Sequence, residues 1–208
     1  MKWKICGMRD VRNCEEVAEA NPDFMGFIWA KKSPRYVGED FVIPQSIPQH
    51  IQKVGVFVNE STEKIIVLSK SAGFTWVQLH GEEGNQEIQI LKNAGLKVIR
   101  ALSVATKEDV KEANRFTNLP HYFLFDTKKG AQVGGTGERF DWDILEAYNL
   151  DIPIILAGGL DDQNLQAALE LSKKYPIEVL DFNSKLEIEP GLKDVSKVKA
   201  VGKNIRNI

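Results

Sequence analysis

The sequence has few of the residues that build disulfide frameworks or clustered metal sites. Its 208 residues include only two cysteines, Cys6 and Cys14, and three histidines, His50, His80 and His121. Two cysteines are too few for a disulfide framework or a four-cysteine zinc site, and their scarcity suggests a reducing compartment. The histidines lack the spacing of a local metal motif. We therefore expect neither a disulfide nor a metal ion to hold this protein together.

Long hydrophobic runs and an excess of one charge are also missing. No stretch approaches the roughly 18 apolar residues of a membrane span, and the N-terminus MKWKICGMRD has no apolar run typical of a signal peptide. The net charge is −2, which provides no overall attraction to nucleic acid or to a membrane surface. We expect a cytoplasmic protein with no nucleic-acid partner and no membrane partner.

The composition and length are those of an ordinary soluble domain. Hydrophobic residues make up 43% of the chain and charged residues 27%, which excludes a disordered or fibrous protein. A chain of this length can form one large domain or two small ones. Because no linker or low-complexity stretch interrupts it, we predict a single domain over residues 1–208.

Eight short apolar runs recur at intervals of about 25 residues. Several are rich in β-branched or aromatic residues, which favours buried strands over helices. A hairpin needs far less chain than this interval, whereas a strand, a helix and two loops need about this much. The runs cover residues 3–6, 24–29, 54–58, 75–79, 97–102, 121–125, 153–156 and 178–182.

Amphipathic segments with helix signals fill most of the intervals. Asp10 can cap the first helix, and Gly73 and Gly95 can end the helices after the third and fourth runs. The segment after the second run carries Pro44 and Pro48, so its helix should be short or irregular. Further helix candidates are residues 109–116, 141–148, 161–175 and 195–205.

Eight strand–helix units can form a closed (β/α)8 TIM barrel or an open doubly wound sheet. The number of units favours the barrel, because eight is its closure number. In either fold, ligands bind at the C-terminal ends of the parallel strands. Candidate functional residues should therefore follow directly after each apolar run.

Two of these strand ends carry groups suited to proton transfer. Cys6 ends the first run beside Arg9 and a helix start, which would favour a thiolate able to act as a nucleophile or general base. The alternative is that Cys6 only fills core space. Asp126 closes the apolar run HYFLFD, where a raised pKa would suit a general acid. A helix cap or an ion pair in a loop is the alternative for Asp126.

The ends of the last two runs favour phosphate. Gly158 and Gly159 lie between the seventh run and a helix expected to begin at Asp161, so their backbone N–H groups could approach an anion. Asn183 and Ser184 follow the eighth run, and barrels often bind phosphate after strands 7 and 8. An ordinary left-handed turn is the alternative for the two glycines.

Two further loops have weaker signals. Arg35, in the motif SPR, could bind a carboxylate through two parallel hydrogen bonds or could be a solvated surface residue. The glycine-rich residues 134–137 neither follow a strand directly nor open a helix with dinucleotide spacing. A nucleotide-binding loop is therefore not expected there.

Taken together, seven motifs resemble the phosphoribosylanthranilate isomerase family of tryptophan biosynthesis. From about Lys4 to Asp194 they are KICGMRD, GFIW…KSPR, VGVFVN, VQLHG, FLFDT…GGTGERFDW, ILAGGL and DFNSKLE…PGLKD. The resemblance implies a barrel, monomeric or homodimeric, that uses no metal or organic cofactor. It implies an Amadori rearrangement of N-(5′-phosphoribosyl)anthranilate to 1-(2-carboxyphenylamino)-1-deoxyribulose 5-phosphate.

The resemblance also assigns roles to individual residues. It makes Cys6 the general base, Asp126 the general acid and Arg35 the group that binds the anthranilate carboxylate. Lys185 stands where many members have glycine; lysine lacks glycine's freedom at positive φ, but its ammonium could meet the phosphate directly. The remaining residues are Asp181, expected near the sugar and amine, and the phosphate group of Gly158, Gly159 and Ser184.

Two other functions fit the sequence less well than the isomerase. A metal-dependent pentose-phosphate epimerase would need paired His and Asp ligands at matching strand ends, and the sequence does not place them there. A phosphate-binding barrel without catalysis is disfavoured because both Cys6 and Asp126 are present.

Overall fold

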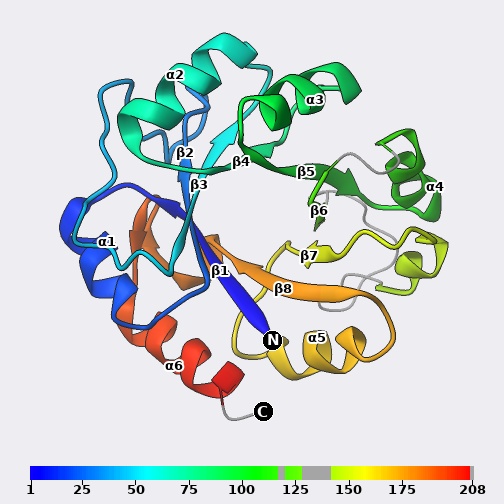
Figure 1. The fold of residues 1–208 in the computed structure, drawn as a ribbon. Coiled ribbons are helices and arrows are strands. Elements are labelled where there is room, and N and C mark those ends of the chain that lie inside the picture. The colour runs from blue at the N-terminus through cyan, green and yellow to red at the C-terminus, as the bar shows by residue number, and fades with distance from the viewer. Residues whose placement is uncertain (117–119, 128–141, 207–208) are drawn as a thin grey trace.

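Eight parallel strands close into a barrel, as predicted. The structure is a computed structural model that describes residues 1–116, 120–127 and 142–206. The strands pair in chain order, and β8 closes the ring against β1. Figure 1 shows them at the centre of the molecule with helices arranged around them. They are β1 (Lys2–Met8), β2 (Phe24–Ile28), β3 (Gln52–Phe57), β4 (Trp76–Leu79), β5 (Lys97–Val104), β6 (Tyr122–Thr127), β7 (Ile154–Leu156) and β8 (Ile177–Phe182).

Alternating side chains of each strand divide between two hydrophobic clusters. In β1, Trp3 and Ile5 join the larger cluster, which also contains the buried faces of the helices. Cys6 joins a smaller cluster formed by strand residues that fill the barrel. Because side chains alternate with a period of two, Lys4 points to the same inner side as Cys6. In β8 the same alternation places Asp181 on the inner side, with Val179.

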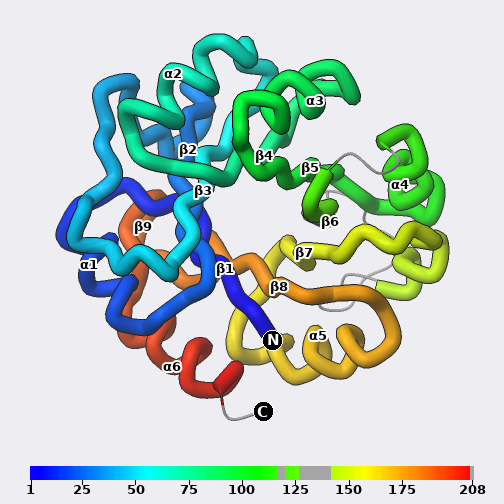
Figure 2. Tube along the Cα trace, in the orientation of Figure 1, coloured from blue at the N-terminus to red at the C-terminus, as the bar shows by residue number. Residues whose placement is uncertain are grey.

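The expected signals begin and end several of the outer helices. The Asp10 carboxylate accepts a hydrogen bond from the Asn13 N–H at 2.7 Å at the start of α1, and Gly73 adopts φ 83° after α2. Figure 2 shows α6 lying beside α1, so the last helix closes the outer ring. The helices are α1 (Val11–Ala18), α2 (Thr62–Ala72), α3 (Asn85–Asn93), α4 (Lys107–Lys111), α5 (Leu165–Ser172) and α6 (Val195–Arg206).

The segment between β2 and β3 is irregular, as its residues Pro44 and Pro48 predict. Residues 29–51 form turns and contain no helix. The segments predicted at 109–116 and 141–148 are largely 3₁₀ helix, η1 (Glu112–Phe116) and η2 (Trp142–Ala147). None of the helices within the described ranges is long and apolar enough to cross a membrane.

Two local features differ from the sequence-based expectations. The helix expected from Asp161 begins only at Leu165, because the Asp161 carboxylate accepts hydrogen bonds from the N–H groups of Gln163 and Asn164 and forms a turn instead. After β8, the short helix η3 (Ser184–Leu186) leads into a hairpin of β9 (Glu187–Glu189) and β10 (Leu192–Lys193), which the apolar pattern did not predict.

Candidate active site

A buried ion pair lies beside Cys6 at the carboxyl end of the barrel. Lys4 Nζ donates a hydrogen bond to Asp181 Oδ2 at 2.8 Å, and the side chains are 0% and 7% exposed. Burial acts to lower the pKa of Lys4, but the charges of Asp181 and Cys6 and the hydrogen bonds to them together outweigh it, so the pKa of Lys4 is raised and the ammonium stays charged. The positively charged Lys4 side chain therefore lies on the same side of β1 as the Cys6 thiol, two residues away along the strand.

The surroundings of Cys6 differ from those that the sequence predicts. Burial raises the pKa of its thiol, and the positive charges of Lys4 and Lys193 oppose that increase. The expected cation, Arg9, instead lies exposed and donates to the Pro34 carbonyl at 3.2 Å. Cys14 is fully buried in the core, and burial raises the pKa of its thiol to about 12.

Asp126, the next-to-last residue of β6, is on the inner side of the barrel and lies near His80. Its side chain is 38% exposed, and its Oδ2 is 3.7 Å from His80 Nε2. The apolar run lies below the carboxylate, in β6, and does not enclose it. Gln78 Nε2 lies 3.3 Å from His80 Nδ1. Burial, helped by the charge of Lys4, lowers the pKa of His80, so its imidazole is neutral at pH 7.

Arg35 is engaged by a carboxylate of this chain. Its Nε donates to Glu187 Oε1 at 2.8 Å and its Nη2 to Glu187 Oε2 at 2.5 Å. Lys193 Nζ also donates to Glu187 Oε1, at 2.7 Å. Burial acts to raise the pKa of Glu187, but these hydrogen bonds dominate and lower it to about 2. Arg35 is therefore not a freely solvated surface residue, and the carboxylate that it holds belongs to the protein itself.

The predicted phosphate residues lie in two loops, after β7 and β8. Gly158 and Gly159 adopt φ values of 97° and 66°, and no atom lies within 4 Å of a Cβ added to Gly159. Ser184 and Lys185 lie in η3 with exposed side chains. Because α5 begins only at Leu165, the two glycines do not belong to its first turn.

Comparisons with known proteins show which family the chain is similar to. The family described as N-(5′-phosphoribosyl)anthranilate (PRA) isomerase matches residues 3–204. The PRA isomerase of Petrotoga mobilis is 37% identical over 210 residues, covering 100% of this chain and 98% of that protein. The enzyme of Phocaeicola vulgatus is 39% identical over 195 residues, covering 94% and 93%.

This chain belongs to the PRA isomerase family. It is an isomerase of tryptophan biosynthesis, as the sequence motifs imply. A crystal structure of the Thermotoga maritima isomerase superposes with a TM-score of 0.83 at 29% identity and covers 100% of both chains. A PRA isomerase in complex with reduced 1-(o-carboxyphenylamino)-1-deoxyribulose 5-phosphate superposes with a TM-score of 0.81 at 27% identity, again over 100% of both chains.

Four residues near this PRA isomerase site were not predicted individually. Lys4, His80, Glu187 and Lys193 all lie within quoted motifs, but each could equally have been a surface residue. One signal was available for Lys4: a charged residue at an inward-facing position of an apolar strand must find a buried partner. The glycine-rich residues 134–137 lie outside the described residues.

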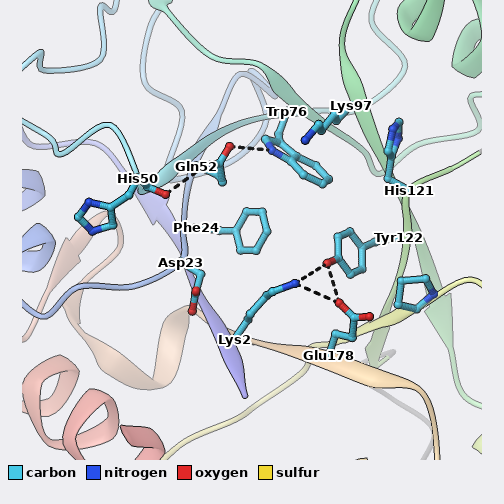
Figure 3. A pocket seen from close by; sticks show the side chains of 11 residues that line it. Lys2, Asp23, Phe24, His50, Gln52, Trp76, Lys97, His121, Tyr122 and Glu178 are labelled. Carbon is cyan, nitrogen blue, oxygen red and sulfur yellow. Dashed lines mark hydrogen bonds and ion pairs between the residues drawn. The ribbon is translucent and has the colours of Figure 1, made fainter.

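A cavity of about 530 Å³ lies at the opposite end of the barrel. Figure 3 shows its lining, which comes mainly from the first residues of the strands, including Lys2, Phe24, Trp76 and Tyr122. Its polar groups already have partners; Lys2 Nζ, for example, contacts Tyr122 Oη at 3.3 Å and Glu178 Oε2 at 3.2 Å. Within the ranges described above, no group of three or more His, Cys, Asp or Glu side chains forms a metal site.

Proposed function

We propose that Cys6 is the general base and Asp126 the general acid of the Amadori rearrangement. The observation that carries the proposal is the position of Cys6, near the carboxyl end of β1 on the inner side of the barrel. The positive charges of Lys4 and Lys193 oppose the rise in thiol pKa that burial causes there. Asp126 lies near the end of β6 and Cys6 near the end of β1, with β7 and β8 between those strands in the ring. A substrate above the barrel would therefore lie between the two groups.

The proposed reaction needs one acid and one base. Protonated Asp126 gives its proton to the ribose ring oxygen, the bond from that oxygen to C1′ breaks, and the amine nitrogen forms a Schiff base with C1′. The Cys6 thiolate then removes the C2′ proton, the released electron pair forms a C1′=C2′ double bond, and the π electrons of the C1′=N bond return to the nitrogen, which gives an enaminol. Its hydroxyl proton is lost and C1′ gains a proton, which produces the ketose. No atom is gained or lost overall.

The ends of the substrate are held by the groups around this pair. We assign the anthranilate carboxylate to Arg35, and the phosphate to Gly158, Gly159, Ser184 and Lys185. Asp181 is assigned to the substrate amine and sugar. In support, Asp181 Oδ1 is buried and has no hydrogen-bond partner among the residues described here, so a substrate donor would satisfy it. Holding both ends keeps the reacting atoms near Cys6 and Asp126.

Separate replacements of the acid and the base test these roles. In Cys6→Ser and Asp126→Asn proteins, kcat should fall by about 10²–10⁴-fold, followed as the loss of substrate fluorescence. Cys14→Ala serves as the matched thiol control and should keep its turnover per folded molecule. Near-wild-type kcat in either active-site variant, with the fold retained by circular dichroism, would overturn the corresponding role.

We further propose that the enzyme acts in the cytoplasm as a monomer or homodimer. Membership of a tryptophan-biosynthesis family supports the first part. For the second, a related structure is described as mutually generated monomers of the dimeric Thermotoga maritima enzyme. Cell fractionation tests the location, and light scattering at several protein concentrations tests the oligomeric state; a larger assembly would contradict the proposal.

A further inference from the structure

Arg35 is already paired with a carboxylate of its own chain, although it is assigned to bind a substrate carboxylate. Its fork is held by Glu187 through two hydrogen bonds of 2.8 and 2.5 Å. Nη1 makes no hydrogen bond within the described part of the chain, so one edge of the guanidinium remains available. An Arg–Glu pair by itself carries no net charge, however, and a second carboxylate approaching it would be repelled by Glu187.

Lys193 supplies the missing positive charge. Its side chain is fully buried, and Nζ donates to Glu187 Oε1 at 2.7 Å and to Asn183 Oδ1 at 2.7 Å. Arg35, Glu187 and Lys193 together therefore carry a net charge of +1. Because these charges are largely shielded from water, that excess acts on a nearby anion more strongly than it would at the surface.

The position of Lys193 is built into the fold. Asn13, in α1, accepts from the Lys193 N–H at 2.8 Å and donates to the Lys193 carbonyl at 2.9 Å. These two bonds fix β10 beside α1 and point the ammonium toward Glu187. A surface lysine would spend most of its time in solvent, whereas this one has a single buried environment.

The cluster lies directly beside the proposed base. A Cβ added to Gly7 would lie 2.6 Å from Arg35 Cδ and 2.7 Å from Asn183 Oδ1. Only glycine at this position therefore leaves room for the Arg35 side chain to pack against the backbone next to Cys6. Gly7 also adopts φ 79°, which favours glycine. The guanidinium is thereby placed at one wall of the site and not out in solvent.

We propose that Lys193 is a positioning residue that sets the enzyme's preference for a substrate carboxylate. Glu187 holds Arg35 in one orientation, and Lys193 cancels the charge of Glu187, so the free edge of Arg35 still attracts an anion. This inference rests on the proposed role of Arg35. It differs from that role because it concerns two residues that do not themselves contact the carboxylate.

Binding of two product analogues separates these roles. The first is reduced 1-(2-carboxyphenylamino)-1-deoxyribulose 5-phosphate, and the second is the same compound without the carboxyl group. The ratio of their Kd values defines the carboxylate preference. Binding is a better measurement than turnover here, because Lys193 also affects the Cys6 thiol. For wild-type protein we expect a preference of about 10–100-fold, the range for a charge-assisted hydrogen-bonded pair.

Lys193→Gln should reduce the preference by about threefold or more, because the cluster becomes neutral. Adding Glu187→Gln to it should raise the preference again, because Arg35 regains an uncancelled charge. A lysine that only supports the fold would show no such rescue. Lys193→Met is the second variant if the glutamine protein does not fold, and Lys203→Gln, an exposed lysine of α6, is the matched control.

The outcomes also separate this inference from the proposed role of Arg35. If Arg35→Met keeps the wild-type preference, the role of Arg35 itself is wrong. If Arg35→Met loses the preference while Lys193→Gln keeps it, only the role of Lys193 is wrong. A loss in Lys193→Gln that the added Glu187→Gln does not reverse would equally overturn the charge-balancing role.

Discussion

The two ends of the barrel differ in how deeply their charged side chains are buried. At the carboxyl end, Lys4, Asp181, Lys193 and Glu187 are nearly or fully buried, and one oxygen of Asp181 lacks a partner within the described residues. At the amino end, Lys2 and Glu178 pair while about half exposed, above a core of packed rings. Burying ions costs free energy unless they are fully paired. The carboxyl end is therefore arranged for chemistry and the amino end for stability.

The largest contrast should come from the two lysines of β1. Lys4→Met leaves Asp181 buried without its cation, which should cost about 3–5 kcal/mol of unfolding free energy. It also removes a charge that favours the Cys6 thiolate, so kcat/KM should fall. Lys2→Met breaks only a half-exposed pair and should cost less than about 1 kcal/mol, without a kinetic effect. Denaturant unfolding and steady-state kinetics measure both variants.

A double replacement sharpens that comparison. Lys4→Met combined with Asp181→Leu removes both buried charges, so most of the lost stability should return while activity stays low. If the double variant is as unstable as Lys4→Met alone, packing and not charge explains the loss. Recovery of activity together with stability would contradict the assignment of this pair to the active site.

The pH dependence of stability provides a second test at the carboxyl end. The pKa of Glu187 is lowered to about 2 in the folded protein, against an ordinary value of about 4.3. Its contribution is therefore fully present above about pH 4.3 and is lost as pH falls toward 2. That loss should amount to roughly 3 kcal/mol. Glu187→Gln protein should show a flatter decrease of stability over the same pH range; an identical slope would show that Glu187 is not the group responsible.

The sequence predicted the architecture because strands and barrel closure depend on local patterns. Each apolar run predicts a strand from its own residues alone. The spacing of the runs and their number, eight, indicate a closed ring. It did not predict the ion pairs of the site, because Lys4 and Asp181 are 177 positions apart and Arg35 and Glu187 are 152 apart. Partners this distant are defined by the folded barrel and leave no periodic signal.

Local hydrogen bonding explains why the helix after β7 begins later than the sequence predicts. The sequence predicts that a helix begins at Asp161, and the Asp161 carboxylate does accept backbone N–H bonds, but in a turn that precedes the helix. The same side chain is typical of both structures, and only the fold of the following residues distinguishes them.

At the amino end, removing a packed ring should weaken the fold without affecting catalysis. Phe24 makes edge contacts with Trp76 and Tyr122 at centroid distances of 5.3 and 6.3 Å. Phe24→Leu should cost about 1–2 kcal/mol of unfolding free energy, from lost burial and ring contacts. Both kcat and KM should stay at wild-type values. A change in KM would mean that the amino end is coupled to the substrate site.

The smallest effect is expected from an exposed cation at the same end. Lys97 Nζ lies 5.1 Å from the centre of the Trp76 ring. Lys97→Met should lower the unfolding free energy by only about 0.5–1 kcal/mol, the usual value for an exposed cation–π contact. Thermal unfolding at low and high salt measures it, and a loss as large as that of Lys4→Met would remove the contrast between the two ends.

The pH dependence of kcat/KM tests the central claim, that Cys6 is the base, most directly. A base must be deprotonated, so kcat/KM should rise with pH through the pKa of the Cys6 thiol. Because burial raises that pKa, this limb should lie in the alkaline range. It should disappear from the residual activity of Cys6→Ser protein and remain in Cys14→Ala protein. If Cys6→Ser protein keeps the same alkaline limb, another group is the base and the account is wrong.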